Sequence, residues 1–466
     1  MIRVFRHYIS PVKLALMGAD FIFLAAIAFL VVRFDFPLMQ NASTFVLADL
    51  LIELFFSSLV VAGMLAVGCY ASDSVRSFRN FVIRFVLVLL VATLMVAGFL
   101  FFIDYTSMVR KELVYVSLSS LVLVPFLHWM VMGLIVNASL KLKIVIIGDD
   151  AQALEIQSAA KEAKEIGVEV VGIVCLSQTT FDQRSENEAV HLYSEIDDFS
   201  GFVRGLGAET IIPLASARQK ENILADLIAC KMDGMTIQDL TSFYEQAFGY
   251  VDIDSLKDEW IIFADGFKGS SFFEYWLKRL SDITVSSLML LLASPLMIIA
   301  AILVKVTSKG PLFYVQERVG YGGKSFDLFK FRTMTVTAEQ DGPQWAQEND
   351  PRVTAVGGFF RRTRIDELPQ ILNVLRGDMS FVGPRPERPF FVDQFNKSIP
   401  FYQERHFVKP GITGWAQLRY PYGASEEDAK RKLEYDLYYI KNYSIFLDVL
   451  IILQTVRVIL FPSGVR

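Results

Sequence analysis

Long apolar stretches dominate the first third of the chain, at about residues 14–32, 45–69, 80–103 and 113–138. Each has about the 20 residues that a helix needs to cross the hydrocarbon core of a bilayer. Asp49, Glu53 and Arg84 lie near the predicted helix ends, where their side chains can reach the membrane surface. Asp20 lies deeper and is the candidate for a functional intramembrane acid. The pattern predicts four transmembrane helices within residues 1–140.

Basic residues beside these stretches indicate their orientation. They gather at the N-terminus, at the 70–80 connection and after the fourth stretch, as Arg3, Arg6, Lys13, Arg76, Arg79, Lys141 and Lys143. Arg110 and Lys111 in the 104–112 connection weaken the contrast. The balance predicts that both ends of the bundle face the cytoplasm. Because the first stretch reaches Arg33 and others follow, we expect a retained anchor and no cleaved signal peptide.

From residue 143 the pattern changes to short apolar runs that alternate with helix-forming segments. We predict strands at 143–148, 168–174, 209–213 and 235–239, and helices at 151–165 and 215–232. This alternation is typical of a parallel α/β domain, here residues 141–265. The first strand ends in Gly148, but Asp149 and Asp150 follow without a GxGxxG motif, and acids at this turn repel a pyrophosphate. We therefore expect a Rossmann-like domain without a bound dinucleotide.

A fifth apolar run covers residues 283–305 and differs from the other four. Ser294-Pro295 lies at its middle, where proline removes a backbone donor and kinks a helix. Basic residues flank both ends, namely Lys278, Arg279, Lys305 and Lys309. Both observations fit a re-entrant helix that enters and leaves by the cytoplasmic leaflet. The alternative is a kinked spanning helix, which would place the last third of the chain outside the cell.

Two further segments are expected at the membrane surface. An aromatic collar precedes the fifth run, with Phe272, Phe273, Tyr275 and Trp276. The stretch 444–461 is apolar, with only Asp448 and Arg457 charged. We therefore predict that residues 266–466 form a mixed, mainly α, membrane-associated domain that contains the re-entrant helix.

Composition agrees with membrane segments joined to soluble domains, because 53% of residues are hydrophobic while 20% are still charged. The net charge of −5 indicates no nucleic-acid partner. Cys69, Cys175 and Cys230 are far apart and form no CxxC motif. We interpret them as small buried apolar residues and expect neither a disulfide nor a metal site from them.

Short motifs rich in Arg, Lys, Gly and Pro follow one another between residues 306 and 440. They read Gln316-Glu317-Arg318, Lys330-Phe331-Arg332-Thr333-Met334, Arg361-Arg362-Thr363-Arg364-Ile365-Asp366-Glu367-Leu368-Pro369-Gln370, Gly383-Pro384-Arg385-Pro386-Glu387 and Lys409-Pro410-Gly411-Ile412-Thr413-Gly414-Trp415-Ala416-Gln417. Arginine offers a planar fork to phosphate oxygens, so cations on such loops suit phosphate recognition. Any one of them is as easily a solvated surface residue, and it is the clustering that indicates a phosphate site.

The pair Asp366-Glu367 is the most informative. Pro369 fits a helix only in its first turn, so we expect a helix to begin near Asp366. An aspartate there has a structural interpretation, as an N-cap. It also has a chemical one, as a carboxylate kept ionised by the helix N-terminus that attacks phosphorus. Glu367 could bind Mg²⁺, which neutralises a diphosphate.

At these motifs the sequence resembles the monotopic phosphoglycosyl transferases, also called polyprenyl-phosphate hexose-1-phosphate transferases. The similarity runs almost continuously over about residues 270–466 and includes the Ser294-Pro295 break. Several long motifs in the family's order make the resemblance specific. Four N-terminal helices followed by an α/β domain are similar to the layout of the large exopolysaccharide-initiating members.

The resemblance implies a two-step reaction at the cytoplasmic face of the bacterial inner membrane. Asp366 would attack the β-phosphate of a UDP-sugar of glucose or galactose type, release UMP and carry the sugar phosphate. Undecaprenyl phosphate would then accept it, which initiates exopolysaccharide or capsule synthesis. Mg²⁺ would bind at Asp366 and Glu367, and phosphate contacts would come from Lys330, Arg332, Arg361, Arg364 and Arg385. A homodimer is compatible with the sequence but not required by it.

One segment departs from the family, and two other functions stay open. Many members continue after Trp-Ala-Gln with Val-Asn-Gly-Arg, whereas residues 418–424 read Leu-Arg-Tyr-Pro-Tyr-Gly-Ala, which leaves the sugar open. A nucleotide-sugar dehydratase or epimerase would need a glycine-rich cofactor loop and a Tyr-x-x-x-Lys pair, and the sequence has neither. The intact Asp366-Glu367 pair argues against a non-catalytic scaffold for polysaccharide assembly.

Overall fold

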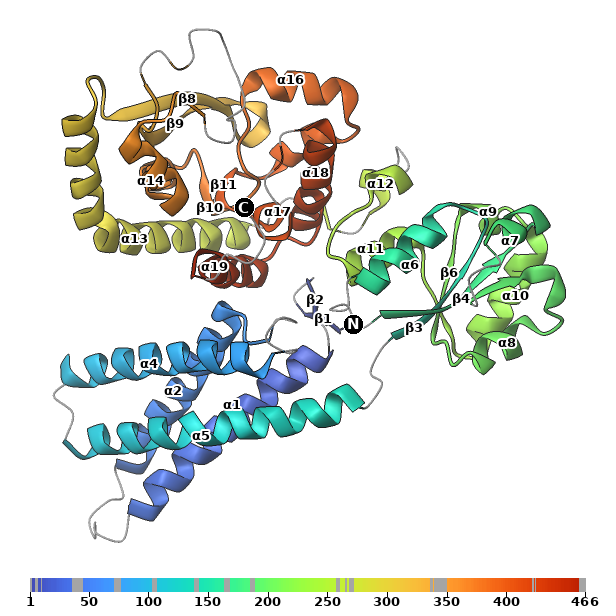
Figure 1. Cartoon of the computed structure of the whole chain (residues 1–466), viewed down its shortest axis with the longest axis horizontal. Helices are drawn as coiled ribbons and strands as arrows, with labels where there is room; N and C mark the ends of the chain where they lie inside the picture. The colour runs from blue at the N-terminus through green and yellow to red at the C-terminus, as the bar shows by residue number, and fades with distance from the viewer. Residues whose placement is uncertain are drawn as a thin grey trace. The chain divides into compact units, whose positions relative to one another are not determined.

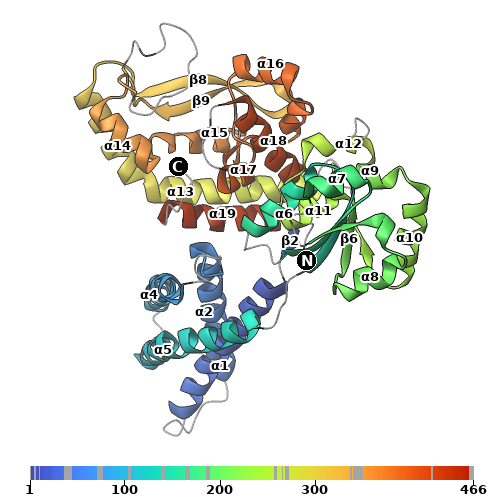
Figure 2. The same cartoon turned by 45° about the vertical axis from the view of Figure 1, so that its right-hand side comes forward.

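The structure, a computed structural model, divides into two compact units, Met1–Gly249 and Tyr250–Arg466 (Figures 1 and 2). It describes residues 2–4, 7–9, 11–35, 45–70, 77–102, 107–137, 142–162, 168–184, 189–256, 260–264, 266–267, 272–335, 338, 350–420, 423 and 425–460. The backbone N–H groups of Val251 and Ile253 donate to Glu434, at 3.1 Å to its O and 3.4 Å to its Oε1. Residues 250–256, which the sequence placed with the α/β domain, therefore pack on the C-terminal unit.

Four apolar helices follow a short antiparallel pair of strands, β1 (Ile2–Val4) and β2 (His7–Ile9). They are α1 (Pro11–Asp35), α2 (Phe45–Val67), α4 (Phe78–Phe102) and α5 (Ser107–Asn137). α1 and α4 each pack against both α2 and α5. Within the described residues, Lys13–Val31, Phe78–Phe101 and Glu112–Val131 are long and apolar enough to span a membrane, and Leu51–Val67 of α2 is shorter. The predicted bundle of four apolar helices is confirmed.

Buried polar contacts tie this bundle together. Asp20 on α1 is 1% exposed, and its Oδ2 lies 3.2 Å from Nδ1 of the buried His128 on α5. The Phe81 ring stacks on the imidazole, with 3.9 Å between centroids. Arg84 is buried and donates from Nη1 to the Gly68 carbonyl at 2.8 Å. The end of α2 leaves carbonyls without helical donors, and this guanidinium satisfies one of them.

Several side chains named from the sequence lie outside the described part of the chain. They are those of Arg6, Arg33, Asp49, Arg76, Arg110, Lys111 and Lys141. The predicted orientation of the bundle rests partly on these basic residues, and it stays a prediction.

A five-stranded parallel sheet forms the rest of the first unit, in the order β5-β4-β3-β6-β7. The strands are β3 (Leu142–Ile147), β4 (Val168–Cys175), β5 (Val190–Leu192), β6 (Thr210–Pro213) and β7 (Thr236–Ile237). The helices are α6 (Gln152–Glu162), α7 (Gln178–Arg184), α8 (Phe199–Gly205), α9 (Ala215–Arg218), α10 (Glu221–Met232) and α11 (Leu240–Ala247). The parallel α/β prediction is confirmed, although it missed the short edge strand β5.

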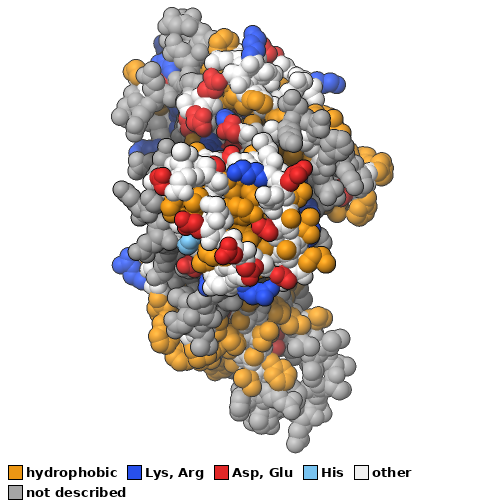
Figure 3. Space-filling model, turned by 90° about the vertical axis from the view of Figure 1, so that its right-hand side faces the viewer, with side chains coloured by type: hydrophobic (Ala, Val, Ile, Leu, Met, Phe, Trp, Pro, Cys, Tyr) orange, Lys and Arg blue, Asp and Glu red, His pale blue; other side chains and the backbone are white. Residues whose placement is uncertain are grey.

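Hydrophobic and charged side chains mix on the outer face of this domain (Figure 3). All three cysteines are buried, as expected.

The turn after β3 is closed by its own carboxylates. Asp149 Oδ1 accepts from the N–H groups of Leu176 and Ser177, at 2.7 and 3.2 Å. Asp150 Oδ2 accepts from the Ser216 hydroxyl at 2.6 Å. Doubly wound sheets bind a pyrophosphate at this edge. Here the donors at the ends of β4 and β6 already face negative charge, which supports the expectation that no dinucleotide binds.

The second unit is mixed and mainly helical, as predicted. Its strands form the antiparallel hairpin β8 (Phe313–Val319) and β9 (Ser325–Phe331) and the parallel pair β10 (Ser380–Val382) and β11 (Gly411–Thr413). Its helices are α12 (Trp260–Phe263), α13 (Phe272–Thr307), α14 (Ala355–Thr363), α15 (Gln370–Arg376), α16 (Pro389–Ser398), α17 (Trp415–Arg419), α18 (Glu426–Lys441) and α19 (Ile445–Leu460).

Helix α13 contains the Ser294-Pro295 pair and is drawn as two limbs joined by a sharp bend (Figures 1 and 2). Proline cannot donate to the carbonyl four residues earlier, which is that of Leu291. The Ser294 hydroxyl donates to this carbonyl at 2.9 Å and replaces the missing bond. Apolar side chains stand exposed before and after the proline, for example Leu291 at 71% and Ile298 at 61%. α13 is also long and apolar enough to span, so membrane re-entry stays a prediction.

The polar side of α13 is fastened to the rest of the unit. Lys278 Nζ donates to Asp448 Oδ2 on α19 at 2.6 Å. Asp282 Oδ1 accepts from the Ser380 hydroxyl and the Phe381 N–H on β10, each at 2.9 Å. Farther along, Ala300 and Val304 join an apolar cluster that includes Phe331, Phe360 and Ile365. α13 therefore packs against β9 and against the turn that follows α14.

Helix α14 approaches the end of β9 so closely that one glycine is required. A Cβ on Gly357 would lie 2.1 Å from the Thr333 carbonyl oxygen, whereas a Cβ on Gly358 would meet only Val353, at 3.9 Å. We predict that Gly357→Ala lowers the free energy of unfolding by about 1–3 kcal/mol through overpacking. Gly358→Ala should be neutral or stabilising by up to about 1 kcal/mol, because alanine has the higher helix propensity. Thermal unfolding of the detergent-solubilised protein measures both, and equal shifts would contradict the assigned contact.

Candidate functional site

A single turn between α14 and α15 carries both acidic residues predicted from the sequence. Ile365–Glu367 form a 3₁₀ turn, η5. Arg364, which ends α14, adopts φ 59° and ψ 16°, a left-handed conformation that non-glycine residues rarely adopt. The buried Ile365 anchors the turn in the apolar cluster with α13 and β9. The chain reversal at Arg364 thus presents Asp366 and Glu367 together beside β9.

Glu367 is the centre of a cluster of cations. Its Oε1 accepts from Lys330 Nζ at 3.2 Å and from Arg385 Nη2 at 2.7 Å. Arg364 Nη1 lies 3.6 Å from the same oxygen. Burial alone would raise the pKa of Glu367, but Arg385 and Lys330 hold it well below its usual range. Glu367 is therefore an ionised carboxylate that brings Lys330 and Arg385, from other parts of the sequence, together with the neighbouring Arg364.

Asp366 is in a different state. It is 8% exposed, and its Oδ1 has no hydrogen-bond partner among the described residues. Burial, reinforced by the charge of Glu367, raises the pKa of Asp366 to about 6 against the opposing charges of Lys330, Arg364 and Arg361. Neighbouring carboxyl groups whose pKa values are pushed apart are a recurrent property of catalytic pairs.

The expected role of Asp366 as a helix N-cap is wrong. α15 begins at Gln370, with Pro369 as its N-cap, and the cap of η5 is Arg364. Because no α-helix begins at Asp366, a helix N-terminus does not provide the interaction that was expected to keep this carboxylate ionised. Arg364, in its left-handed conformation, ends α14 and begins a separate turn that contains Asp366. Helix propensity does not predict this break.

The other predicted cations divide into two groups. Lys330, Arg364 and Arg385 contact Glu367, and Arg361 on α14 lies close enough to lower the pKa of Asp366. Arg361 makes no hydrogen bond or ion pair with any described residue. Arg332 lies elsewhere: it is 6% exposed and donates from Nη2 to the Ser308 carbonyl and hydroxyl, at 2.9 and 2.7 Å. Its Nε and Nη1 have no hydrogen-bond partner in the part of the chain that the structure describes.

Glycines of two motifs serve close backbone packing beside this site. A Cβ on Gly383 would lie 2.2 Å from the Lys409 carbonyl oxygen, and one on Gly411 would lie 2.1 Å from the Gly383 nitrogen. These contacts bring β10 and β11 together. The loop at 383–388 leaves this junction and carries Arg385 to Glu367.

Sequence reasoning missed residues that support the site from buried positions. Asn373 on α15 donates to the Asp327 carbonyl at 2.7 Å and accepts from the Phe329 N–H at 3.1 Å, which holds the edge of β9 next to Lys330. Arg405 and Arg318 contact the loop at 383–388. Arg318 belongs to a motif noted in the sequence, whereas nothing in the local pattern distinguishes Arg405 or Asn373.

The dyad offers a metal ion only part of a ligand set. No group of three or more His, Cys, Asp or Glu residues in the described part of the chain could hold a metal. Asp366 and Glu367 supply two carboxyl groups, and one Glu367 oxygen already faces Lys330 and Arg385. Mg²⁺ sites of this kind use one or two carboxylates and complete the shell with substrate phosphates and water. The residues fit Mg²⁺ only together with a phosphate-bearing substrate.

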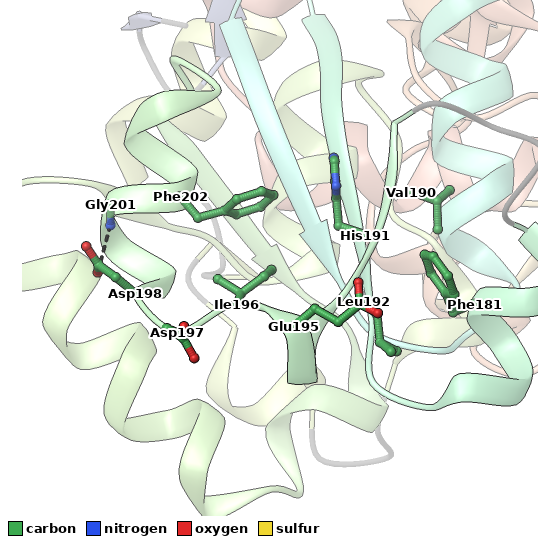
Figure 4. A pocket seen from close by; sticks show the side chains of 10 residues that line it. All are labelled: Phe181, Val190, His191, Leu192, Glu195, Ile196, Asp197, Asp198, Gly201 and Phe202. Carbon is green, nitrogen blue, oxygen red and sulfur yellow. Dashed lines mark hydrogen bonds between the residues drawn. The ribbon is translucent and has the colours of Figure 1, made fainter.

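A cleft of about 490 Å³ in the α/β domain has a different character (Figure 4). Phe181 and Phe202 are among its apolar residues, and Glu195 and Asp197 add negative charge. The His191 ring packs edge-on against Phe202, with 4.9 Å between centroids. Burial lowers the pKa of His191, so none of the described residues that line the cleft is a cation at neutral pH. It does not suit a phosphate, and the dyad remains the candidate active site.

Comparisons with known proteins agree on one family of transferases. A family model described as Bacterial sugar transferase matches residues 273–462. The UDP-N-acetylgalactosamine-undecaprenyl-phosphate N-acetylgalactosaminephosphotransferase of Aeromonas hydrophila is 45% identical over 240 residues, 52% of this chain and 56% of the relative. A UDP-glucose:undecaprenyl-phosphate glucose-1-phosphate transferase of Klebsiella pneumoniae is 50% identical over 181 residues, 38% of this chain and 39% of the relative. A protein of the same description from Caulobacter vibrioides is 43% identical over 183 residues, 38% of this chain and 68% of the relative. The chain thus spans 56% and 39% of the first two relatives.

Two variants of Arg364 distinguish the contribution of its left-handed backbone from that of its side chain. Arg364→Gly should unfold at the same or a higher temperature, because glycine relieves a left-handed strain of about 1 kcal/mol. The lost ion pair contributes little, since the Arg364 side chain is 59% exposed. Arg364→Val should be destabilised by about 1–2 kcal/mol, because a β-branched residue tolerates this conformation poorly. If both variants lost the same stability in thermal unfolding, side-chain contacts rather than backbone strain would hold the turn.

Proposed function

Because this chain belongs to the bacterial sugar transferase family, we propose that it transfers a sugar-1-phosphate from a UDP-sugar to undecaprenyl phosphate. The observation that carries this proposal is the buried Asp366 oxygen without a partner, next to a carboxylate that gathers cations. A buried polar atom without a partner is costly unless a ligand uses it. A phosphorus atom held by the surrounding cations would give this oxygen its partner.

The proposed reaction has two displacements at the same phosphorus. First, an Asp366 oxygen attacks the β-phosphorus of the UDP-sugar, and UMP leaves with the electrons of the broken P–O bond. Then a phosphate oxygen of undecaprenyl phosphate attacks that phosphorus, and Asp366 leaves as a carboxylate. The product is an undecaprenyl diphosphate sugar. A pKa of about 6 leaves Asp366 largely ionised at neutral pH, as a nucleophile must be.

The cations would divide the work of binding phosphate. Arg361 has no protein partner among the described residues and is half-buried, so it is free to contact a phosphoryl oxygen. Lys330, Arg364 and Arg385 are already near Glu367, and their charge would offset that of the diphosphate. We assign Arg332 a supporting role at the end of α13, because its Nη2 donates to the carbonyl and the hydroxyl of Ser308.

We propose that Mg²⁺ binds with the donor diphosphate, held by Asp366 or Glu367. When bound, it would neutralise diphosphate charge and favour departure of UMP. Glu367 would hold its cations in place throughout, while Asp366 changes from free carboxylate to phosphoryl carrier. The sugar stays open, because the relatives named above include N-acetylgalactosamine and glucose transferases.

We further propose that α13 enters and leaves the bacterial inner membrane by its cytoplasmic leaflet. The exposed apolar limbs, the bend and the basic residues at both ends support this placement. The dyad turn packs on α13 through Ile365. The site would then lie at the membrane surface, where a lipid phosphate and a soluble nucleotide sugar can both reach it.

Asp366→Asn should abolish transfer. We expect wild-type protein with Mg²⁺ and undecaprenyl phosphate to release UMP from one of UDP-glucose, UDP-galactose and UDP-N-acetylgalactosamine, and EDTA to stop the release. The asparagine variant should lose activity by at least about 10³-fold, because the amide cannot replace the carboxylate nucleophile. Asp393→Asn is the matched control, since Asp393 is exposed on α16. Full activity of Asp366→Asn would remove the nucleophile assignment.

Re-entry of α13 can be tested by labelling. Phe272→Cys and Lys309→Cys lie at the two ends of the helix, and the native cysteines are buried. Both introduced thiols should react with an impermeant maleimide only in inside-out vesicles, because both ends would face the cytoplasm. Reaction of the two positions from opposite sides would show a spanning helix, and the catalytic unit would then face away from cytoplasmic UDP-sugars.

A further inference from the structure

The loop at 383–388, which carries Arg385 to the dyad, is held at four successive carbonyl oxygens. Those of Pro384, Arg385, Pro386 and Glu387 accept from Gly411 N at 2.9 Å, Arg405 Nη2 at 3.0 Å, Arg318 Nη1 at 2.9 Å and Val319 N at 2.9 Å. Two of these donors are backbone groups of β8 and β11. The other two are guanidinium groups from different parts of the chain, so the middle of the loop depends on side chains.

We propose that Arg405 and Arg318 are positioning residues for the transfer reaction. Each would hold one carbonyl of this loop and so fix Arg385 against Glu367. The inference rests on the proposed function, because it assigns these residues to the geometry of the same site. Neither guanidinium contacts the dyad in the described structure, so both would act through Arg385.

Arg405 is built into the interior. It is 6% exposed and donates to the Tyr402 hydroxyl at 2.5 Å and to Asp436 Oδ2 at 2.9 Å. Asp436 on α18 is 2% exposed. Buried ion pairs of this kind are seldom a net gain over apolar packing. Apolar residues at this position could not donate a hydrogen bond to the Arg385 carbonyl, as Arg405 does.

Arg318 contacts the loop from β8. Its Nε and Nη2 both donate to Gln316 Oε1, at 3.0 and 2.6 Å, which orients the guanidinium plane. Its Nη1 is then free to donate to the Pro386 carbonyl, and it also lies 3.3 Å from Glu387 Oε2. Arg405 and Arg318 thus donate to the neighbouring carbonyls of Arg385 and Pro386. The two arginines lie 87 residues apart in the sequence.

The composition of the loop explains why side chains are needed. Pro384 and Pro386 have no N–H, so the loop cannot pair through a regular strand ladder on both sides. Its carbonyls remain as the available attachment points. Misplacement of a catalytic group by 1 Å can cost about 10²-fold in rate. A loop that is fixed at four successive carbonyls would keep the Arg385 guanidinium within that tolerance.

A double-mutant cycle tests this assignment. Arg405→Lys keeps a charge beside Asp436 but loses the fork that reaches the Arg385 carbonyl. We expect it to lower kcat/KM for UMP release about tenfold in the wild-type background. In an Arg385→Gln background the same change should cost less than about twofold, since the group that it positions is gone. Equal losses in both backgrounds would overturn the proposal.

Arg352→Lys is the matched control for this cycle. Arg352 pairs with Asp350 through its Nε at 2.8 Å and does not contact the loop, so its effect should be the same in both backgrounds. Thermal unfolding identifies variants that fail to fold. Arg318→Lys, at a side chain that is 16% exposed, repeats the cycle if Arg405→Lys is unstable. Absence of lipid-dependent UMP release by the wild type would remove the proposed function and this inference together, whereas an active wild type with additive losses would remove the inference alone.

Discussion

The attraction between one buried carboxylate and the cations around it organises the catalytic unit. Lys330 from the β8–β9 hairpin, Arg364 from the end of α14 and Arg385 from the loop after β10 all converge on Glu367. Without that negative charge these cations would repel one another in a poorly solvated space. Burial raises the pKa of Asp366 and the charge of Glu367 raises it further, whereas Arg385 and Lys330 lower the pKa of Glu367, so two adjacent acids differ chemically.

The membrane helix and the site are parts of one packed structure. Ala300 and Val304 of α13 pack in the cluster that holds Phe331 at the end of β9 and Ile365 before the dyad. Lys278 and Asp282 fasten the first limb of the helix to α19 and β10. A displacement of α13 would therefore change the positions of Lys330 and Asp366.

Periodicity predicted the elements well where burial follows from local sequence. The four apolar helices and strands β3, β4 and β6 have long regular patterns, whereas β5 spans only Val190–Leu192 and was missed. The sequence located the dyad and three of its cations but could not show that Arg332 turns to Ser308. The supporting roles of Asn373, Arg318 and Arg405 depend on partners far along the chain, which no local pattern encodes. For Asp366, a left-handed residue overrode the expected helix start.

The hydrogen bond from the Ser294 hydroxyl to the Leu291 carbonyl has an evolutionary consequence. Replacement of Ser294 alone would remove the donor to the Leu291 carbonyl, and replacement of Pro295 alone would restore a competing backbone donor and favour a straight helix. Neither single step is neutral, so the two positions should drift as a linked pair. An ancestor could have converted a spanning anchor into a bent one, or the reverse, by exchanging this dipeptide.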